Sequence, residues 1–353
     1  NMVRSERFEW VDSSRGVAIL GVVCIHVCCT FLYQTPPRLS PETWWFLSIL
    51  TCVSKVGVPL FLMLSGTVNL GSPSKSVIDR SYFRRLQRIL IPFTFWALVY
   101  LIFKAKGGFR WISWMEALGV INGQVHYHLW FVYSIIGLYL ITPMVNAFVI
   151  AIGESQSLLV GAFLLALTGF EWSIQNVFQF YCDANLFKPL PVYAGYYILG
   201  YGLRSLKVTP TIRDYSYVTF GACAVVSLGI SYYLNRNVES FDNRGFHNLN
   251  PVVMAMSISA FVMLKPIDKP AVNQGASWIT RMFALLGRGS FGVYLSHVLV
   301  LEVSFQYLYW NNRKVQTSIP VALLAPVAII LITCLSWSVT TAISKVPIMR
   351  RLV

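Results

Sequence analysis

Charged residues are scarce in this chain of 353 residues. Asp, Glu, Lys and Arg make up only 12% of it, hydrophobic residues make up 56%, and the mean hydropathy is +0.60. Soluble globular domains usually carry about twice that fraction of charged residues. The composition therefore excludes a soluble protein and predicts an all-α fold, a polytopic bundle of transmembrane helices.

The chain also lacks the patterns that indicate a metal site, a disulfide framework or a nucleic-acid surface. Its seven cysteines lie mostly within apolar runs and show no paired spacing, so we predict neither a bound metal nor a disulfide framework. The formal net charge is +14, but the basic residues lie between the apolar runs and form no arginine-rich arm. We therefore expect membrane lipids as partners, and not nucleic acid.

Ten apolar runs are long enough, or nearly long enough, to be membrane spans. The first has no signal-peptide cleavage pattern, so we expect it to remain as a helix. The ten runs cover residues 11–33, 44–70, 89–103, 128–150, 157–171, 192–204, 215–234, 251–265, 290–309 and 320–342.

The basic residues outside these runs predict the orientation of the chain. The segments on the side of the N-terminus hold 17 Lys and Arg residues and those on the other side hold 9, with Arg15 and Lys55 left out. This bias predicts that both termini are cytoplasmic. We find no internal repeat and no second soluble domain, so we interpret residues 1–353 as one membrane domain. The lack of symmetry disfavours a transporter built from inverted repeats.

The first run carries three ionisable residues that share one helical face. Arg15 and His26 are eleven residues apart, which is about 16 Å along a helix axis and roughly 20° past three full turns. Asp12 lies roughly 40° from His26 on the same count. His26 would then lie near the bilayer midplane, where an ionisable side chain is costly and indicates a functional site.

Two interpretations of His26 stay open. It either hydrogen-bonds a neighbouring helix and stabilises the bundle, or it acts as a general base in a buried chamber, with Arg15 holding an anionic ligand at the entrance. A neutral imidazole can accept a proton from a hydroxyl near neutral pH. Cys24 and Cys28 flank His26, and we interpret both as small packing residues.

A basic segment, Arg84-Arg85-Leu-Gln-Arg88, precedes the hydrophobic part of the third span. Arg85 and Arg88 are three positions apart, so both can point the same way on a helix. They either anchor the cytoplasmic side or, together with Arg15, bind the phosphates of a nucleotide-like ligand, because guanidinium groups suit anionic oxygens. We interpret Arg84 as an anchor.

Three further polar residues lie inside expected spans. Lys55 of the second span either reaches outward or pairs with an acid, which we slightly favour, or it lines a cavity. Tyr294 and His297 of the ninth span are three residues apart. They either form hydrogen bonds between helices or belong to the functional site.

Two histidines and a tryptophan lie at the outer start of the fourth span. Trp130 is typical of the aromatic belt at a membrane interface. His126 and His128 lack a third ligand at metal spacing, so we favour a role in holding a sugar, because imidazoles hydrogen-bond hydroxyl groups.

Taken in order, these motifs resemble those of the acyltransferase-3 family of integral membrane acyltransferases. The size and the N-terminal third look most like the inner-membrane O-acetyltransferases of the WecH type, which act on enterobacterial common antigen. The matching segments run over nearly the whole chain: Trp10-Val-Asp12-Ser-Ser-Arg15-Gly-Val-Ala-Ile with His26, Val58-Pro-Leu-Phe-Leu-Met-Leu-Ser65-Gly66, Arg85-x-x-Arg88, His128-Leu-Trp130-Phe-Val, Leu138-Tyr-Leu-Ile-Thr-Pro143, Tyr197-Ile-Leu-Gly200-Tyr-Gly202 and Phe291-Gly-Val-Tyr294-Leu-Ser-His297.

The resemblance implies a multi-pass enzyme of the bacterial inner membrane that uses cytoplasmic acetyl-CoA. Its acceptor would be a hydroxyl of a cell-surface glycan or of the lipid-linked precursor. Arg15, Arg85 and Arg88 would bind the phosphates of CoA, His26 would be the general base, and Asp12 would orient Arg15 or neighbouring groups. We prefer direct transfer to an acetyl-histidine intermediate. The residues that would line the acceptor cavity are His128, Trp130, Tyr294, His297 and Lys55.

Three other functions stay open. The chain could export a modified polysaccharide intermediate, as some members of this family have been suggested to do. It could be a glycosyltransferase, although Glu239 and Asp242 are the only close acidic pair in the outer loops and look like a solvated turn. It could also transfer an acyl group other than acetyl, which the length of the pocket would decide.

Overall fold

The computed structural model describes residues 2–33, 39–72, 80–104, 125–177, 192–238, 240–267, 277–306, 320–347 and 349–353. These residues form helices, and no β-strand occurs among them, so the predicted all-α fold is confirmed. Three 3₁₀ turns accompany the helices, at Leu203–Ser205, Arg244–Phe246 and Arg350–Leu352. The helices are α1 (Met2–Leu32), α2 (Pro41–Ser54), α3 (Gly57–Asn69), α4 (Arg80–Lys104), α6 (Trp130–Asn176), α7 (Ala194–Gly202), α8 (Pro210–Asn235), α9 (Pro251–Leu264), α10 (Trp278–Arg288), α11 (Ser290–Ser304) and α13 (Val321–Lys345).

Three helices begin with a capping side chain followed by proline. Ser40, Thr209 and Asn250 each accept a hydrogen bond from a backbone N–H in the first turn of α2, α8 and α9. The next residue in each case is proline, which needs no partner for its nitrogen at the first helical position. These starts are therefore encoded locally in the sequence.

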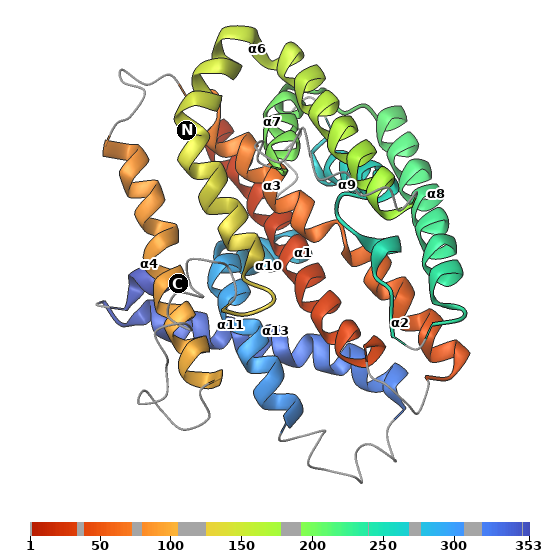
Figure 1. The fold of residues 1–353 in the computed structure, drawn as a ribbon. Coiled ribbons are helices and arrows are strands. Elements are labelled where there is room, and N and C mark those ends of the chain that lie inside the picture. Colours follow the sequence, from red (N-terminus) through yellow and green to blue (C-terminus); the bar gives the residue numbers. More distant parts are fainter. Residues whose placement is uncertain are drawn as a thin grey trace.

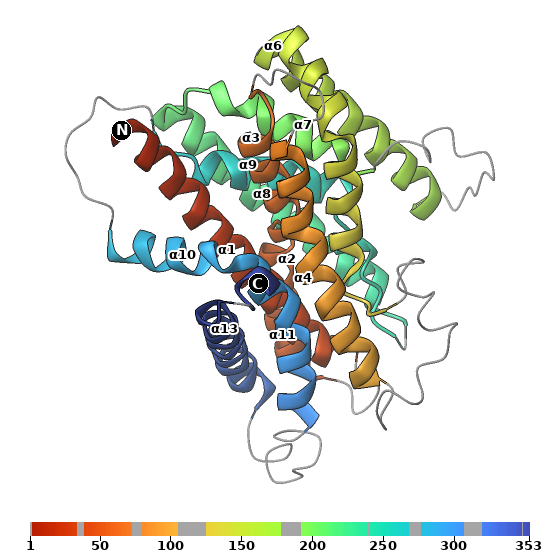
Figure 2. The same cartoon turned by 90° about the vertical axis from the view of Figure 1, so that its left-hand side faces the viewer.

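Helix α6 consists of two helices joined at Gly153. This residue has φ of 78° and ψ of 174°, values that a residue with a side chain rarely adopts. Figures 1 and 2 show that the second half of α6 turns back after this point. The two halves correspond to the fourth and fifth expected spans.

The number of spans differs from the ten that we expected. By length and apolar character, seven helical segments of the described residues can cross a membrane, or eight if α10 and α11, which meet at 75°, form one bent span. One reason is that the 47 residues of α6 count as one segment. The other is that α7 has only nine residues, which rise about 14 Å, roughly half the hydrocarbon core.

Helix α1 contacts α2, α3, α10, α11 and α13, and it runs through the bundle in Figure 1. Beside it, α3 and α7 approach closely because their backbones meet at Gly66 and Gly200. A Cβ atom at Gly66 would overlap the carbonyl of Tyr197, and one at Gly200 would overlap the carbonyl of Met63. Small residues permit such contacts between membrane helices.

We call the two ends of the bundle the Arg15 end and the Tyr33 end, after the residues of α1 that lie there. The last residues of the chain lie along α4, where Arg351 lines a cleft with Arg84 and Arg88, and Nε1 of Trp96 donates to the carbonyl of Leu352. The expected position of both termini on one side of a membrane stays a prediction.

Candidate functional site

Four of the five histidines of the chain lie together beside the second half of α1. His26 comes from α1, His126 and His128 from the segment 125–129 that precedes α6, and His297 from α11. The ring of His26 lies 5.0 Å from that of His297 and 6.3 Å from that of His128. The rings of His128 and His297 are 5.4 Å apart. The structure thus joins three residues that the sequence had placed in separate motifs, and we call the four the histidine cluster.

A carboxylate fixes the proton positions on two of these rings. Oε1 of Glu302, on α11, lies 3.2 Å from Nε2 of His126. A carboxylate accepts, so neutral His126 carries its proton on Nε2 and its Nδ1 is an acceptor. Nδ1 of His126 lies 3.0 Å from Nδ1 of His128. With both imidazoles neutral, His128 donates from Nδ1, and this assignment leaves a lone pair on its Nε2.

The same reasoning assigns His297. Its Nδ1 lies 2.6 Å from the carbonyl oxygen of Tyr294, which can only accept, so the Nδ1 of His297 donates. The Nε2 atom of neutral His297 then also carries a lone pair. The hydroxyl of Tyr294 donates to the carbonyl of His128 and ties α11 to the segment before α6.

Two of these imidazole nitrogens are buried without a partner. Nε2 of His128 and Nε2 of His297 have no hydrogen-bond partner among the described residues. His26 lies beside both rings and is itself partly exposed. Buried polar atoms are nearly always satisfied in folded proteins. The two free nitrogens, next to an accessible imidazole, can therefore accept protons or hydrogen bonds from a bound molecule.

Lys55 lies at the break between α2 and α3, near the histidine cluster. Its charge acts on His26, on Cys29 and on His247. Lys55 is partly exposed, and its role as a cavity residue stays a prediction. Trp130 lies elsewhere: its ring is 38% exposed and contacts Phe131 and Tyr193, not a histidine.

Asp12 lies at the Arg15 end and not in the histidine cluster. Its Oδ1 is 3.8 Å from a guanidinium nitrogen of Arg15, and its Oδ2 is 3.5 Å from Nε of Arg288. Fourteen residues of helix separate Asp12 from His26, about 21 Å along the axis. Asp12 therefore positions two arginines and does not touch the imidazoles.

The charges of the three arginines that we predict to bind phosphate act on one tyrosine. The charges of Arg15, Arg85 and Arg88 all act on the hydroxyl of Tyr139, on the first half of α6. Nδ2 of Asn69, the last residue of α3, donates to the same hydroxyl at 2.8 Å. Arginines from α1 and α4 are thus close enough to one polar group for their charges to act on it.

A basic cleft of about 540 Å³ lies next to this point. Arg84, Gln87 and Arg88 line it from α4, and Arg351 lines it from the last residues of the chain. The structure places Arg84, which the sequence predicts to be an anchor, in this cleft with Arg88. Residues four apart share a helical face, which explains this pairing.

The arginines and the histidine cluster are separated by packed helix. On α1, Ile19, Val22 and Val23 lie between Arg15 and His26, and each is at most 2% exposed. The side of α1 that joins the two groups is therefore closed in this structure.

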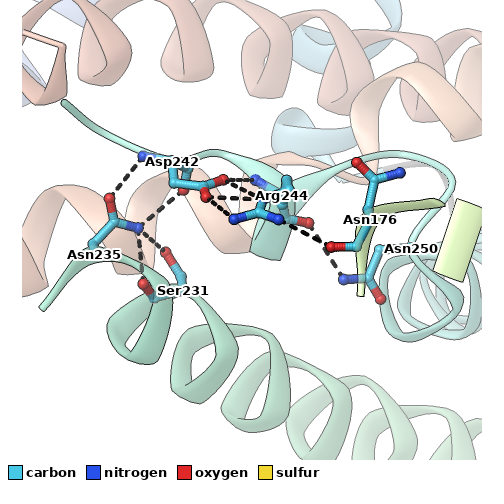
Figure 3. A network of polar contacts seen from close by, with 6 residues as sticks. All are labelled: Asn176, Ser231, Asn235, Asp242, Arg244 and Asn250. Carbon is cyan, nitrogen blue, oxygen red and sulfur yellow. Dashed lines mark hydrogen bonds and ion pairs between the residues drawn. The ribbon is translucent and has the colours of Figure 1, made fainter. Parts of the chain in front are cut away.

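A polar network holds residues 240–250 at the Tyr33 end (Figure 3). Arg244 binds both carboxylate oxygens of Asp242 and donates to the carbonyl of Asn176 at 2.9 Å. Asn235, at the end of α8, donates to the carbonyl of Asp242 and accepts from its N–H. Asp242 therefore belongs to a structural network, and no partnership with Glu239, which lies outside the described residues, is needed to explain it.

Sequence reasoning missed three residues of these sites. Glu302 carried a usable signal, because it is the only charged residue of α11, and an acid in an apolar span indicates function. Tyr139 lies in an apolar motif and Arg351 in an ordinary basic segment, so neither has a distinguishing pattern. No group of three or more His, Cys, Asp and Glu side chains in the described parts is arranged to hold a metal ion.

An apolar helical bundle with seven or eight candidate membrane spans among the described residues is typical of a multi-pass membrane protein. A family model described as an acyltransferase domain, that of the acyltransferase-3 family, matches residues 8–341, so the chain belongs to this family. The chain is also similar to the nodulation protein NolL of Sinorhizobium fredii (strain NBRC 101917 / NGR234), with 22% identity over 180 residues. That match covers 50% of this chain and 47% of NolL, about half of each. No solved structure matches.

We predict that the network around Asp242 makes stability depend on pH. Burial raises the pKa of the Asp242 carboxyl, but the hydrogen bonds and the charge of Arg244 outweigh burial and lower the pKa overall. The carboxylate therefore stabilises the fold above its unfolded pKa of about 4, and this is lost as pH falls through the lower folded value. The Asp242→Asn variant should melt below wild type at about pH 7, and the difference should shrink towards about pH 3.

The control for this measurement is Asp214→Asn, which changes an exposed carboxylate at the Arg15 end. It should melt like wild type at both pH values. A melting difference for Asp242→Asn that stayed constant with pH would contradict the role of the carboxylate charge.

Proposed function

We propose that this acyltransferase moves an acetyl group from cytoplasmic acetyl-CoA to a hydroxyl of a cell-surface glycan, or of its lipid-linked precursor, in the bacterial inner membrane. The observation that carries the proposal is the histidine cluster. Nε2 of His128 and Nε2 of His297 lack partners beside the accessible ring of His26. A hydroxyl group bound there would donate its one proton to an imidazole nitrogen and would lie next to a base.

In this proposal His26 takes the proton of the acceptor hydroxyl while the oxygen attacks the thioester carbonyl carbon. The carbon–sulfur bond breaks, and His26 returns the proton to the departing thiolate, so the products are an acetyl ester and the CoA thiol. The lone pairs on Nε2 of His128 and His297 can accept a hydrogen bond from protonated His26 and stabilise its charge. Glu302 is a positioning residue, because it acts through His126 and His128.

The arginine-rich end fits the phosphates of CoA. Its basic cleft of about 540 Å³ is lined by Arg84, Arg88 and Arg351, and guanidinium groups bind phosphate oxygens with two parallel hydrogen bonds. Arg15 and Arg85 extend this charge to Tyr139, between α1 and α6. Binding there would direct the rest of the donor along α1 towards the histidines.

The closed packing along α1 adds a condition to this proposal. The donor thioester has to cross about 16 Å between Arg15 and His26, and Ile19, Val22 and Val23 fill that side of α1. We infer that donor binding separates α1 from its neighbours at this level. Closure in the absence of donor would keep water and protons from crossing the membrane.

The decisive measurement is acetyl-CoA turnover by the purified protein in detergent, with and without an acceptor that contains N-acetylglucosamine. His26→Ala should lose at least about 100-fold in turnover, the usual share of a general base, while CoA binding survives. The matched control is His247→Ala, since this fifth histidine stacks on Trp172 outside the cluster and its loss should leave turnover near wild type. Wild-type protein that neither consumes acetyl-CoA nor binds CoA would overturn the proposal and favour export.

The role of Glu302 makes a separate prediction. Glu302→Ala removes the acceptor that fixes the protons on His126 and His128, and turnover should fall by at least about tenfold, because a wrong imidazole tautomer is catalytically costly. Glu302→Gln keeps an acceptor oxygen and should recover part of the rate with an altered pH profile. Equal losses in both variants, with an unchanged pH profile, would show that Glu302 only supports the fold.

The basic cleft is tested through the Michaelis constant. Arg351→Gln and Arg84→Gln should raise KM for acetyl-CoA by about tenfold, the effect of losing one charge-assisted contact with phosphate, and should change kcat little. Arg281→Gln is the control, because Arg281 is an exposed arginine of α10 at the same end. If all three variants behaved alike, the cleft would not bind the donor.

A further inference from the structure

A second cavity, of about 230 Å³, opens between the start of α2 and the end of α8. We call it the α2–α8 pocket. Trp44, Trp45 and Tyr232 line one side; the rings of Trp45 and Tyr232 stack at 5.3 Å with 20° between their planes, and Trp44 meets Trp45 edge-on at 5.1 Å. The remaining lining includes the polar residues Asn235 and Arg236.

The pocket contains exposed aromatic rings and an exposed guanidinium group. Trp45 is 38% exposed and Tyr232 is 51% exposed. The guanidinium of Arg236 lies 4.2 Å from the ring centre of Tyr233 and is exposed. A water molecule takes about 30 Å³ of liquid, so the space of about 230 Å³ corresponds to roughly eight waters, enough for one sugar ring.

A strip of α1 joins the pocket to the histidine cluster. His26, Cys29, Thr30 and Tyr33 share one helical face. All four are partly or half exposed, whereas the residues between them are buried. The ring of Tyr33 packs edge-on against that of Phe241 at 5.3 Å, and Phe241 lines the pocket. The strip is about 11 Å long, and it contrasts with the closed side of α1 towards the Arg15 end.

The far wall of the pocket is held in place by the network of Figure 3. Asn235 lines the pocket and is bound to the backbone of Asp242. Asp242 is clamped by Arg244, which also binds the end of α6 at Asn176. The loop that carries Phe241 is thus fixed to two helices, and the pocket is largely formed before a ligand binds.

The chemistry of this lining fits a carbohydrate. A pyranose ring presents an apolar C–H face, which packs on aromatic rings, and a rim of hydroxyls, which bind guanidinium and amide groups. We propose that the α2–α8 pocket binds one sugar ring of the acceptor glycan, and that the strip leads the residue to be acetylated to His26. This inference rests on the proposed transfer to a glycan, and it places acceptor entry at the end opposite to the donor.

Direct binding tests the pocket without acetyl transfer. The probe is N,N′-diacetylchitobiose added to the purified full-length protein in detergent, followed by saturation-transfer NMR and by tryptophan fluorescence. Trp45→Leu and Tyr232→Leu should each weaken binding by at least about tenfold, which corresponds to about 1.4 kcal/mol. Both side chains are substantially exposed, and the folding of each variant is checked by retained CoA binding.

The matched control is Trp278→Leu, which removes a tryptophan that is 73% exposed on α10. It should leave sugar binding unchanged. Absence of sugar binding by wild type, or binding that Trp45→Leu and Tyr232→Leu do not weaken, overturns the proposal and leaves the aromatic residues as a membrane-interface belt. Sugar binding that these variants weaken, in a protein that does not turn over acetyl-CoA, supports the pocket and rejects the proposed transfer. Turnover with an unchanged KM for the acceptor in both variants rejects the pocket alone.

Discussion

The contact between Glu302 and His126 is the interaction on which the arrangement of the histidine cluster depends. A neutral imidazole can hold its proton on either nitrogen, and its hydrogen-bond partners decide which. The carboxylate fixes the proton of neutral His126 on Nε2. Through the contact between the two Nδ1 atoms, it also fixes the proton of neutral His128 on Nδ1. The carbonyl of Tyr294 does the same for His297. Unpartnered nitrogens are costly in such surroundings, so two of them beside His26 point to a molecule that binds there.

The two ends of the bundle differ in chemistry and in access to His26. The Arg15 end concentrates guanidinium groups from α1, α4 and the last residues, and packed aliphatic side chains separate it from the histidines. The Tyr33 end has an aromatic pocket and a partly open strip along α1. An enzyme that joins an anionic donor to a neutral polar acceptor needs such an asymmetry, because one site cannot be complementary to both.

Much of the fold follows from local features of the sequence. Apolar runs, proline after a capping residue and scarce charge predict helices at nearly all the observed places, since these are properties of each segment alone. The number of spans was less certain, because a break such as Gly153 depends on one backbone angle, and a nine-residue helix such as α7 is stable only through its neighbours. The close backbone contact that requires glycine at a position such as Gly66 is seen only when the facing helix is known.

The sequence by itself determined the class of protein, the helical segments and the candidate functional residues. These candidates are ionisable groups in apolar runs, where burial costs free energy and therefore indicates a function. It also placed His26, Arg15 and Asp12 on one face of one helix, because helical periodicity is local. Only the tertiary structure decided which of these residues meet. In the structure, four histidines from three segments lie together, and Asp12 lies apart from them. Glu302 contacts His126, and Arg351 lines the basic cleft. The reason is that distances between helices arise from packing over the whole chain, which no local pattern encodes.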